Sequence, residues 1–154
     1  MTKKKSKKKN SISLNKFVKK HYYRYGVEVN EDRAIPSPID GLKPVARRTL
    51  WAAYKLGARS TSKLSKSARI VGEVIGLYHP HGDSSVYDAL VKMANSNLNT
   101  IEGVGNFGRF NDKTYAAMRY TNARLSKYSD KVFFDSFYLT ALQLVPNFDG
   151  STTE

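Results

Sequence analysis

Two helix-forming segments joined by a short turn, within residues 67–94, restrict the fold of this chain more than any other feature. The first segment runs from about Ser67 to Ile75 and ends at the turn GLYHPHGDSS. Asp83 or Ser84 can cap the second segment, which continues to about Ala94. Its inward positions would be Val86, Leu90 and Met93. In a basic chain, helix, turn and capped helix form the outline of a helix-turn-helix DNA reader, although periodicity alone does not separate it from another small helical bundle.

Two more helices are predicted upstream of this pair. Ser13 can cap a helix that begins at Leu14 and ends before the proline-rich loop RAIPSPIDG. Apolar residues recur in it at helical spacing, namely Leu14, Phe17, Val18, Tyr22, Tyr25 and Val29. Pro44 fits the first turn of the next helix, PVARRTLWAAYKL, which Gly57 closes.

The sequence pattern changes after Asn95. Residues 99–120 are rich in glycine and then short and strand-like, as in a wing or hairpin beside the helices. Thr121 or Asn122 can cap a last helix, ARLSKYSDKVFFDSF. The sequence therefore predicts a mainly α chain with a small β wing.

The net charge of +13, from 26 Lys and Arg against 13 Asp and Glu, favours a polyanionic partner. Each phosphate contact releases counterions, so nucleic acid is the first expectation and an anionic membrane surface the second. We expect the lysine-rich residues 1–12 to form a disordered, solvated tail that adds non-specific DNA affinity. No long apolar run or signal-peptide core is present, which predicts a soluble, cytoplasmic protein. The absence of cysteine excludes a disulfide scaffold and a thiolate zinc site.

Two short motifs suggest a ligand but fit its requirements poorly. GVGNFG, residues 103–108, matches the dinucleotide fingerprint G-x-G-x-x-G, yet the segment before it is a poor strand and the segment after it a poor helix start. A loop in which glycine lets one backbone approach another is the better interpretation. YHPHGDS holds His79 and His81, but Pro80 restricts them and the chain offers too few further ligands for a metal. Two imidazoles before a helix N-terminus suit a phosphate better, and an ordinary structured turn is the alternative.

Basic side chains surround two other candidate positions. Lys43, Arg47 and Arg48 in DGLKPVARR are either a solvated basic face or, with Arg33, a phosphate-binding surface. A tyrosine phenol with a pKa of about 10 is a weak nucleophile and needs a base or a nearby cation. Arg119 supplies such a charge beside Tyr120 and could stabilise a phosphorane-like transition state, although Arg-Tyr pairs are common.

Four motifs read together resemble one family. RAIPSPIDGLKPVARR, SARIVGEVIGLYHPHGDSSVYDALVKMA, GVGNFG and AAMRYTNARLSK are similar, in this order, to the start of the breakage-reunion subunit of type IIA DNA topoisomerases. That family comprises the A subunit of bacterial gyrase, its topoisomerase IV counterpart and phage relatives. The resemblance covers about residues 14–150.

The resemblance implies a winged-helix (helix-turn-helix) DNA-gate domain over residues 13–154. Tyr120 matches the tyrosine that attacks a DNA phosphodiester, links to the 5′ phosphate and leaves a 3′ hydroxyl. The catalytic positions implied are Tyr120, Arg119, Arg33 and His81. The DNA-contacting positions implied are Lys43, Arg47, His79, His81 and Ser84. Ser84 and Asp88 match positions where quinolone drugs contact the enzyme through a water–metal bridge.

The resemblance also implies what other chains would supply. This chain has no Asp-x-Asp motif for metal and no G-x-x-x-x-G-K-[ST] loop for ATP. In the family both lie on a B-type subunit, so Mg²⁺ and ATP would be bound by that partner. The implied assembly is a homodimer within a heterotetramer, acting on double-stranded DNA.

The family continues where this chain ends, into a tower domain, a coiled coil and an exit gate. We therefore expect a fragment, a split gene or a truncated homologue that is inactive without the partner subunit and the missing C-terminal part. The predicted function is the gate module of an ATP-dependent type II topoisomerase. The alternatives are a winged-helix DNA-binding fragment without catalysis and a regulator of the B-type subunit.

Overall fold

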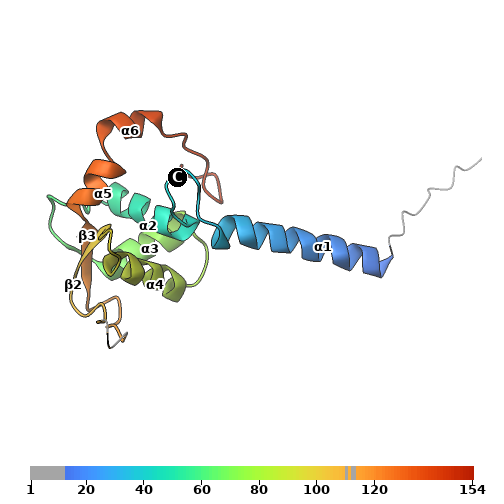
Figure 1. Ribbon diagram of the computed structural model, residues 1–154, viewed down its shortest axis with the longest axis horizontal. Helices are drawn as coiled ribbons and strands as arrows, with labels where there is room; N and C mark the ends of the chain where they lie inside the picture. The colour runs from blue at the N-terminus through green and yellow to red at the C-terminus, as the bar shows by residue number, and fades with distance from the viewer. Residues whose placement is uncertain (1–12, 110, 112–113) are drawn as a thin grey trace, which may run out of the picture.

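The computed structural model describes residues 13–109, 111 and 114–154 (Figure 1), so the expected basic tail lies outside the described part. Its elements in chain order are α1 (Leu14–Val29), a π-helical turn η1 (Asn30–Ala34), α2 (Pro44–Lys55), β1 (Ser65–Lys66), α3 (Ser67–Leu77), α4 (Asp83–Ala94), β2 (Ile101–Val104), β3 (Asn122–Leu125), α5 (Lys127–Val132) and α6 (Ser136–Ala141). The prediction of a mainly α chain with a small β element is confirmed, and the winged-helix assignment stays a prediction. None of the helices in this part of the chain is both long and apolar enough to cross a membrane.

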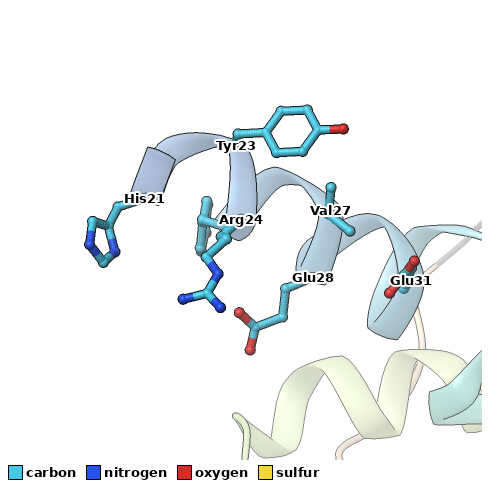
Figure 2. Close-up of a pocket in the computed structure, with 7 residues that line it drawn as sticks. His21, Tyr23, Arg24, Val27, Glu28 and Glu31 are labelled. Atoms are coloured by element: carbon cyan, nitrogen blue, oxygen red, sulfur yellow. The ribbon is translucent and has the colours of Figure 1, made fainter. Parts of the chain in front are cut away.

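Helix α1 projects from the body of the protein as an arm (Figure 1). Its predicted N-cap is confirmed, because the Ser13 hydroxyl accepts a hydrogen bond from the Lys16 backbone at 3.4 Å. The predicted apolar spacing is present as well, but no residue of α1 is buried. Figure 2 shows side chains of α1 and η1 around an open surface depression. The aromatic side chains of this helix therefore face solvent within the described part of the chain.

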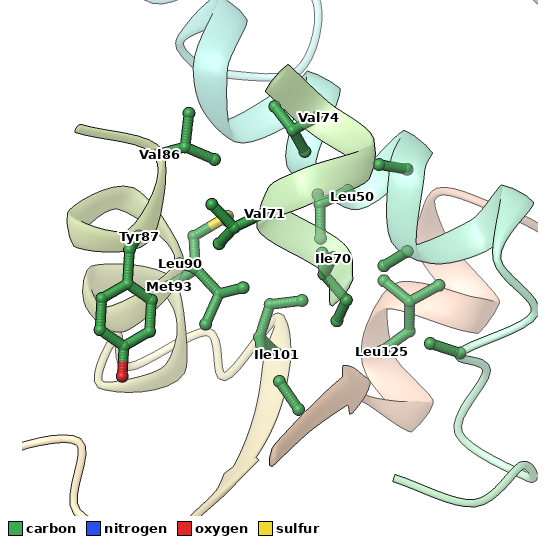
Figure 3. Close-up of a cluster of buried hydrophobic side chains, with 14 of the residues drawn as sticks. Leu50, Ile70, Val71, Val74, Val86, Tyr87, Leu90, Met93, Ile101 and Leu125 are labelled. Atoms are coloured by element: carbon green, nitrogen blue, oxygen red, sulfur yellow. The ribbon is translucent and has the colours of Figure 1, made fainter. Parts of the chain in front are cut away.

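The hydrophobic core lies where α2, α3 and α4 pack on one another above the sheet (Figure 3). Its fully buried side chains include Leu50, Ile70, Val71, Val74, Ile101 and Leu125. Ala52 and Ala53 on α2 are 0% exposed, and their small size lets the helices approach closely. The inward positions predicted for α4 are confirmed, since Val86, Leu90 and Met93 are 0, 0 and 8% exposed.

The predicted ends of α2 are confirmed, whereas the predicted N-cap of α4 is not. Pro44 occupies the start of α2, and Gly57 follows its end with φ +70, as predicted. The N-cap of α4 is Gly82, not Asp83 or Ser84. Asp83 is instead the first helical residue, and its carboxylate accepts the Ser84 N–H at 2.9 Å. The cap prediction was wrong by one or two residues, but a carboxylate in the first turn still favours the positive end of the helix dipole.

A three-stranded antiparallel sheet, in the order β1-β3-β2, closes the core from below. The prediction that the last helix begins near Asn122 was wrong, because Asn122–Leu125 forms the central strand. Ala123 and Leu125 are buried and alternate with half-buried neighbours, which is the period of a strand. Arg124 lies opposite Glu102 of β2, and its Nε is 2.9 Å from the carboxylate.

The helix that follows this strand starts later than predicted. Helix α5 begins at Lys127 and is capped by Ser126, whose hydroxyl accepts the Ser129 N–H at 3.1 Å. A second short helix, α6, follows it. The long last helix expected from the sequence is therefore a strand and two short helices.

The glycine motif GVGNFG forms the end of β2 and a tight loop. The described residues that follow it, 109, 111 and 114–117, are not helical. A Cβ placed on Gly105, whose φ is +120, would lie 3.4 Å from the Thr121 Cα. This close approach to another backbone is the role that the sequence suggested for the loop.

Gly103→Ala should lower the free energy of unfolding by about 1–3 kcal/mol, because the added methyl overpacks the loop. Its Cβ would lie 2.7 Å from the Phe107 ring, which is only 7% exposed and has little room to move. Gly72→Ala in α3 is the matched control, since nothing lies within 4 Å of its added Cβ. That control should raise the free energy of unfolding by about 0.5–1 kcal/mol. Urea titrations of both variants measure the two effects, and equal signs would contradict the packing argument.

Candidate active site

Tyr120 lies in the turn directly before β3, with its side chain in solvent. The residue is 66% exposed, and its backbone N–H donates to the Ala117 carbonyl at 2.9 Å. The Arg119 guanidinium lies 4.7 Å from the centre of the Tyr120 ring. A guanidinium at this distance from a ring makes a cation–π contact. The turn thus presents an exposed tyrosine with a positive group beside its ring.

The residue after Tyr120 fixes this turn to the core. Thr121 is 0% exposed, and its hydroxyl lies 2.8 Å from the Ser67 hydroxyl and 2.9 Å from that of Tyr87. The Ser67 N–H also donates to the Thr121 carbonyl at 3.1 Å. Because Ser67 begins α3 and Tyr87 belongs to α4, both helices hold the backbone that bears Tyr120. An exposed side chain therefore follows directly on the chain from a backbone position that is bonded to two helices.

A second group of candidate residues surrounds the turn between α3 and α4. His79 is 5% exposed, whereas His81 is exposed, and their ring centroids are 4.5 Å apart. Arg48 Nη1 lies 3.1 Å from His79 Nδ1. Since a guanidinium can only donate, Nδ1 accepts and the imidazole is neutral. Arg48 also holds the Glu154 carboxylate with two bonds of 2.8 and 2.6 Å.

The electrostatics of this group keep His79 uncharged. Burial is the main cause that lowers the pKa of His79, to about 4, and the charges of His81, Arg48 and Arg33 lower it further. Arg33 is exposed on η1, and its charge is the smallest of these causes. Because Nδ1 accepts from Arg48, that atom of His79 is not free to bind a metal.

Lys43 and Arg47 lie beside each other at the start of α2. Lys43 is the exposed N-cap residue of the helix. Arg47 binds Asp40 through two hydrogen bonds of 2.8 and 2.9 Å, and its side chain is 49% exposed. Burial raises the pKa of Asp40. The hydrogen bonds from Arg47 and the Leu42 N–H lower it by more, so that the pKa of Asp40 lies below its usual range. Arg47 therefore has to share its guanidinium with Asp40 if it contacts a phosphate.

Ser84 and Asp88 lie four residues apart on α4 and thus on one face of it. Ser84 is exposed. The Asp88 carboxylate accepts a hydrogen bond from the Tyr115 hydroxyl. One of the two predicted drug-contact residues, Asp88, is therefore already hydrogen-bonded to a tyrosine of the same chain.

The candidate residues thus lie in several groups: Arg119 and Tyr120 in the turn before β3, the two histidines in the turn between α3 and α4, Lys43 and Arg47 at the start of α2, and Ser84 and Asp88 on α4. Two residues that organise these groups, Tyr87 and Thr121, were not among the catalytic or DNA-contacting positions expected from the sequence. Arg48 was expected only as part of a solvated basic face or a phosphate-binding surface. Thr121 adjoins Tyr120, so its place in the chain could have indicated it. Nothing in the sequence indicated the role of Tyr87, because the residues that it binds lie far away in the sequence.

Comparison with known proteins gives the family. The family model for the A subunit of DNA gyrase/topoisomerase IV matches residues 33–154. This chain belongs to that family. The resemblance inferred from the four motifs is confirmed at this level.

Individual relatives show how much of the family's length is present. The chain is 45% identical to the DNA gyrase A subunit of Helicobacter pylori over 93% of its own length and 18% of the relative. It is 46% identical to the DNA topoisomerase 4 A subunit of Escherichia coli, over 93% and 19%. For the DNA gyrase A subunit of Thermotoga maritima the identity is 48%, over 86% and 17%. The chain therefore spans less than a fifth of the length of these relatives.

Among the described residues, no three His, Cys, Asp or Glu side chains come together in a way that could hold a metal ion. The expected placement of Mg²⁺ on a B-type partner stays a prediction.

Acidification should destabilise the protein between about pH 6.5 and pH 4 through His79. The folded-state pKa is below the unfolded value, so the unfolded state binds more protons and stability falls as the pH falls through this window. The loss should be about 2–3 kcal/mol, measured by urea unfolding at several pH values. His79→Gln keeps an acceptor for Arg48 and should flatten the pH dependence. His81→Gln removes only one of the lesser causes of the low pKa of His79 and should keep most of the dependence. An unchanged profile for His79→Gln would refute the assignment.

Proposed function

We propose that this chain is the tyrosine-bearing module of the DNA gate of a type IIA topoisomerase. Residues 13–154 would form a winged-helix domain that works as a homodimer, with one Tyr120 for each DNA strand. A B-type subunit would complete a heterotetramer and bring the Mg²⁺ and the ATP that the reaction cycle requires. Cleavage, passage of a second duplex and resealing would then change DNA topology.

The proposed chemistry is a phosphoryl transfer to Tyr120. Its phenol oxygen attacks a backbone phosphorus, loses its proton and forms a P–O bond to the 5′ side of the break. The bond from phosphorus to the 3′ oxygen breaks, and that oxygen takes up a proton and leaves as a hydroxyl. Arg119 stabilises the charge that develops on the phosphate. Because the phosphotyrosine keeps the energy of the broken bond, the reverse attack reseals the strand without ATP.

The remaining candidate residues are assigned to holding DNA. Arg33 and His81 would act near the phosphate under attack. Contacts to the rest of the DNA backbone are assigned to Lys43, Arg47, His79 and Ser84. Since the His79 ring is buried and neutral, we assign it a supporting role under the exposed His81 ring. A quinolone that reaches Ser84 and Asp88 would have to compete with the Tyr115 hydroxyl for the carboxylate.

One observation carries this proposal more than any other, namely the contrast between Tyr120 and Thr121. A packing tyrosine would bury its ring, but Tyr120 is 66% exposed while the next residue is 0% exposed and bonded to two helices. A fixed backbone with a free phenol and an adjacent guanidinium is what a nucleophile requires. The net charge of +13 supplies the attraction for the polyanion that it would attack.

Mapping the DNA-linked residue tests the proposal directly. The chain is mixed with a B-type subunit, Mg²⁺ and end-labelled DNA, and the reaction is quenched with detergent. Nuclease and trypsin then leave a nucleotide on the peptide that ends at Arg124 and contains Tyr120, which mass spectrometry identifies. A nucleotide on that tyrosine supports the proposal, and a nucleotide on another residue would overturn it.

The second candidate, a DNA-binding fragment without catalysis, is favoured by the net charge of +13 alone. It predicts tight binding that weakens steeply with salt and no protein-linked DNA under any of these conditions. The same reactions, run on a binding assay and a denaturing gel, therefore separate the two functions.

A further inference from the structure

Tyr115, five residues before Tyr120, is tied to helix α4. Its hydroxyl donates a hydrogen bond to the Asp88 carboxylate, and its ring meets the Tyr87 ring edge-on with centroids 5.4 Å apart. The hydrogen bond to Asp88, together with burial and the carboxylate charge, raises the pKa of Tyr115 above its usual value. Tyr115 therefore keeps its proton at neutral pH and remains a donor.

The neighbouring residue of α4 holds the same segment at two more points. The Tyr87 hydroxyl lies 2.7 Å from the Ala116 carbonyl and 2.9 Å from the Thr121 hydroxyl. Tyr87 and Asp88, which are neighbours on α4, thus bind residues 115, 116 and 121. The stretch between these positions contains Arg119 and Tyr120, which are both exposed.

Tyr120 lacks an anchor of this kind within the described part of the chain. Its side chain is 66% exposed, and its ring meets the adjacent Arg119 guanidinium, which is itself on the surface. The position of its phenol oxygen consequently depends on how well the chain on either side is held.

Thr121 fixes one side of the turn. On the other side, Ala116 is bonded to the Tyr87 hydroxyl and the Asn106 carbonyl. The bond from Tyr115 to α4 adds a side-chain anchor at residue 115.

We infer that Tyr115 is a positioning residue for the proposed nucleophile Tyr120. Its hydrogen bond to Asp88 clamps the approach segment, residues 115–119, onto α4 and so sets the direction from which the phenol meets a phosphate. This inference rests on the proposed function of Tyr120. It assigns Asp88 a structural task inside the protein that is separate from any contact to a ligand.

The first test removes only the clamping hydroxyl. Tyr115→Phe keeps the ring against Tyr87 and should slow formation of the covalent DNA complex about 10-fold, since a misplacement of about 1 Å can cost 100-fold. The dissociation constant for DNA should stay within about twofold, because no phosphate contact is lost. The matched control is Tyr128→Phe, a tyrosine of similar exposure, 41% against 39%, that also packs edge-on against another ring. The control should match the wild type in both measurements.

A double-mutant cycle tests whether Asp88 is the partner through which Tyr115 acts. Asp88→Ala should slow the reaction by about as much as Tyr115→Phe does. Adding Tyr115→Phe to Asp88→Ala should then have little further effect, because the bond is already lost. Additive effects of the two substitutions would overturn the inferred clamp.

Amide hydrogen exchange provides a measurement that does not depend on activity. The backbone of residues 115–121 should exchange faster in Tyr115→Phe than in the wild type or Tyr128→Phe, while α3 stays unchanged. Unchanged exchange in this segment would overturn the clamp itself. Faster exchange with an unchanged cleavage rate would show a structural bond without a positioning role, which also overturns the inference. If the wild type forms no covalent complex, the proposed function fails, and the exchange rates still decide whether the clamp exists.

Discussion

Replacing Tyr120 with phenylalanine should reduce formation of the covalent DNA complex by at least about 1,000-fold, because it removes the attacking atom. The change deletes one oxygen from a side chain that is 66% exposed and leaves its ring beside Arg119. The fold and the basic surface stay intact, so DNA affinity should change by less than about twofold. Detergent-trapped complexes on a denaturing gel measure the first quantity, and fluorescence anisotropy with labelled DNA measures the second.

Arg119→Lys is the companion variant, since it keeps the positive charge and loses the flat guanidinium. It should form the complex more slowly than the wild type but faster than Tyr120→Phe. Undiminished complex formation by Tyr120→Phe would remove Tyr120 from the mechanism. Loss of DNA affinity in that variant would assign Tyr120 to binding instead.

Leu90→Ala should lower the free energy of unfolding by about 3–4 kcal/mol, the cost of a large buried side chain with its cavity. Leu90 is 0% exposed on α4, the helix that also carries Tyr87 and Asp88. The stability of a domain is about 5–15 kcal/mol, so this one change removes a substantial part of it. Urea unfolding followed by fluorescence measures the loss.

Leu98→Ala is the matched control, because the same atoms are removed from a side chain that is 61% exposed. Its free energy of unfolding should differ from the wild type by less than about 1 kcal/mol. A similar loss in both variants would mean that burial on α4 is not what stabilises the fold.

Helices with strong periodicity and clear end signals could be predicted from the sequence. Ser13, Pro44 and Gly57 mark ends that depend only on residues nearby in the chain. Strand β3 was missed because four residues are too few to show alternation, and because its partners, β1 and β2, lie elsewhere in the sequence. Serine and asparagine favour caps and turns in general, so the choice between Asn122 and Ser126 required the tertiary structure.

In the candidate site, too, some features could be predicted from the sequence and others could not. Tyr120 and Arg119 were selected through a resemblance that long motifs carry, and their roles in this chain stay predictions. The bonds that hold them were invisible, since Thr121 meets Tyr87 34 residues away and Ser67 54 residues away. Long-range side-chain contacts of this kind leave no periodic pattern in a single sequence.

Arg47 and Arg48 show that the direction of a single side chain could not be predicted from the sequence. Both are arginines of the same helix turn, and successive residues of a helix point about 100° apart. The structure directs Arg48 toward His79 and Arg47 toward Asp40. Sequence alone could not decide which of them faces the histidines.

The arm formed by α1 means that heating this protein should not give a single transition. A helix of 16 residues without any buried residue is held mainly by its own propensity, and isolated helices of this length are marginal in water. The only tryptophan, Trp51, lies in α2, so its fluorescence reports on the body of the protein alone. Far-ultraviolet circular dichroism sums both parts and should begin to decline at lower temperature than the fluorescence does. Melting temperatures from the two methods would then differ for a chain whose core unfolds cooperatively.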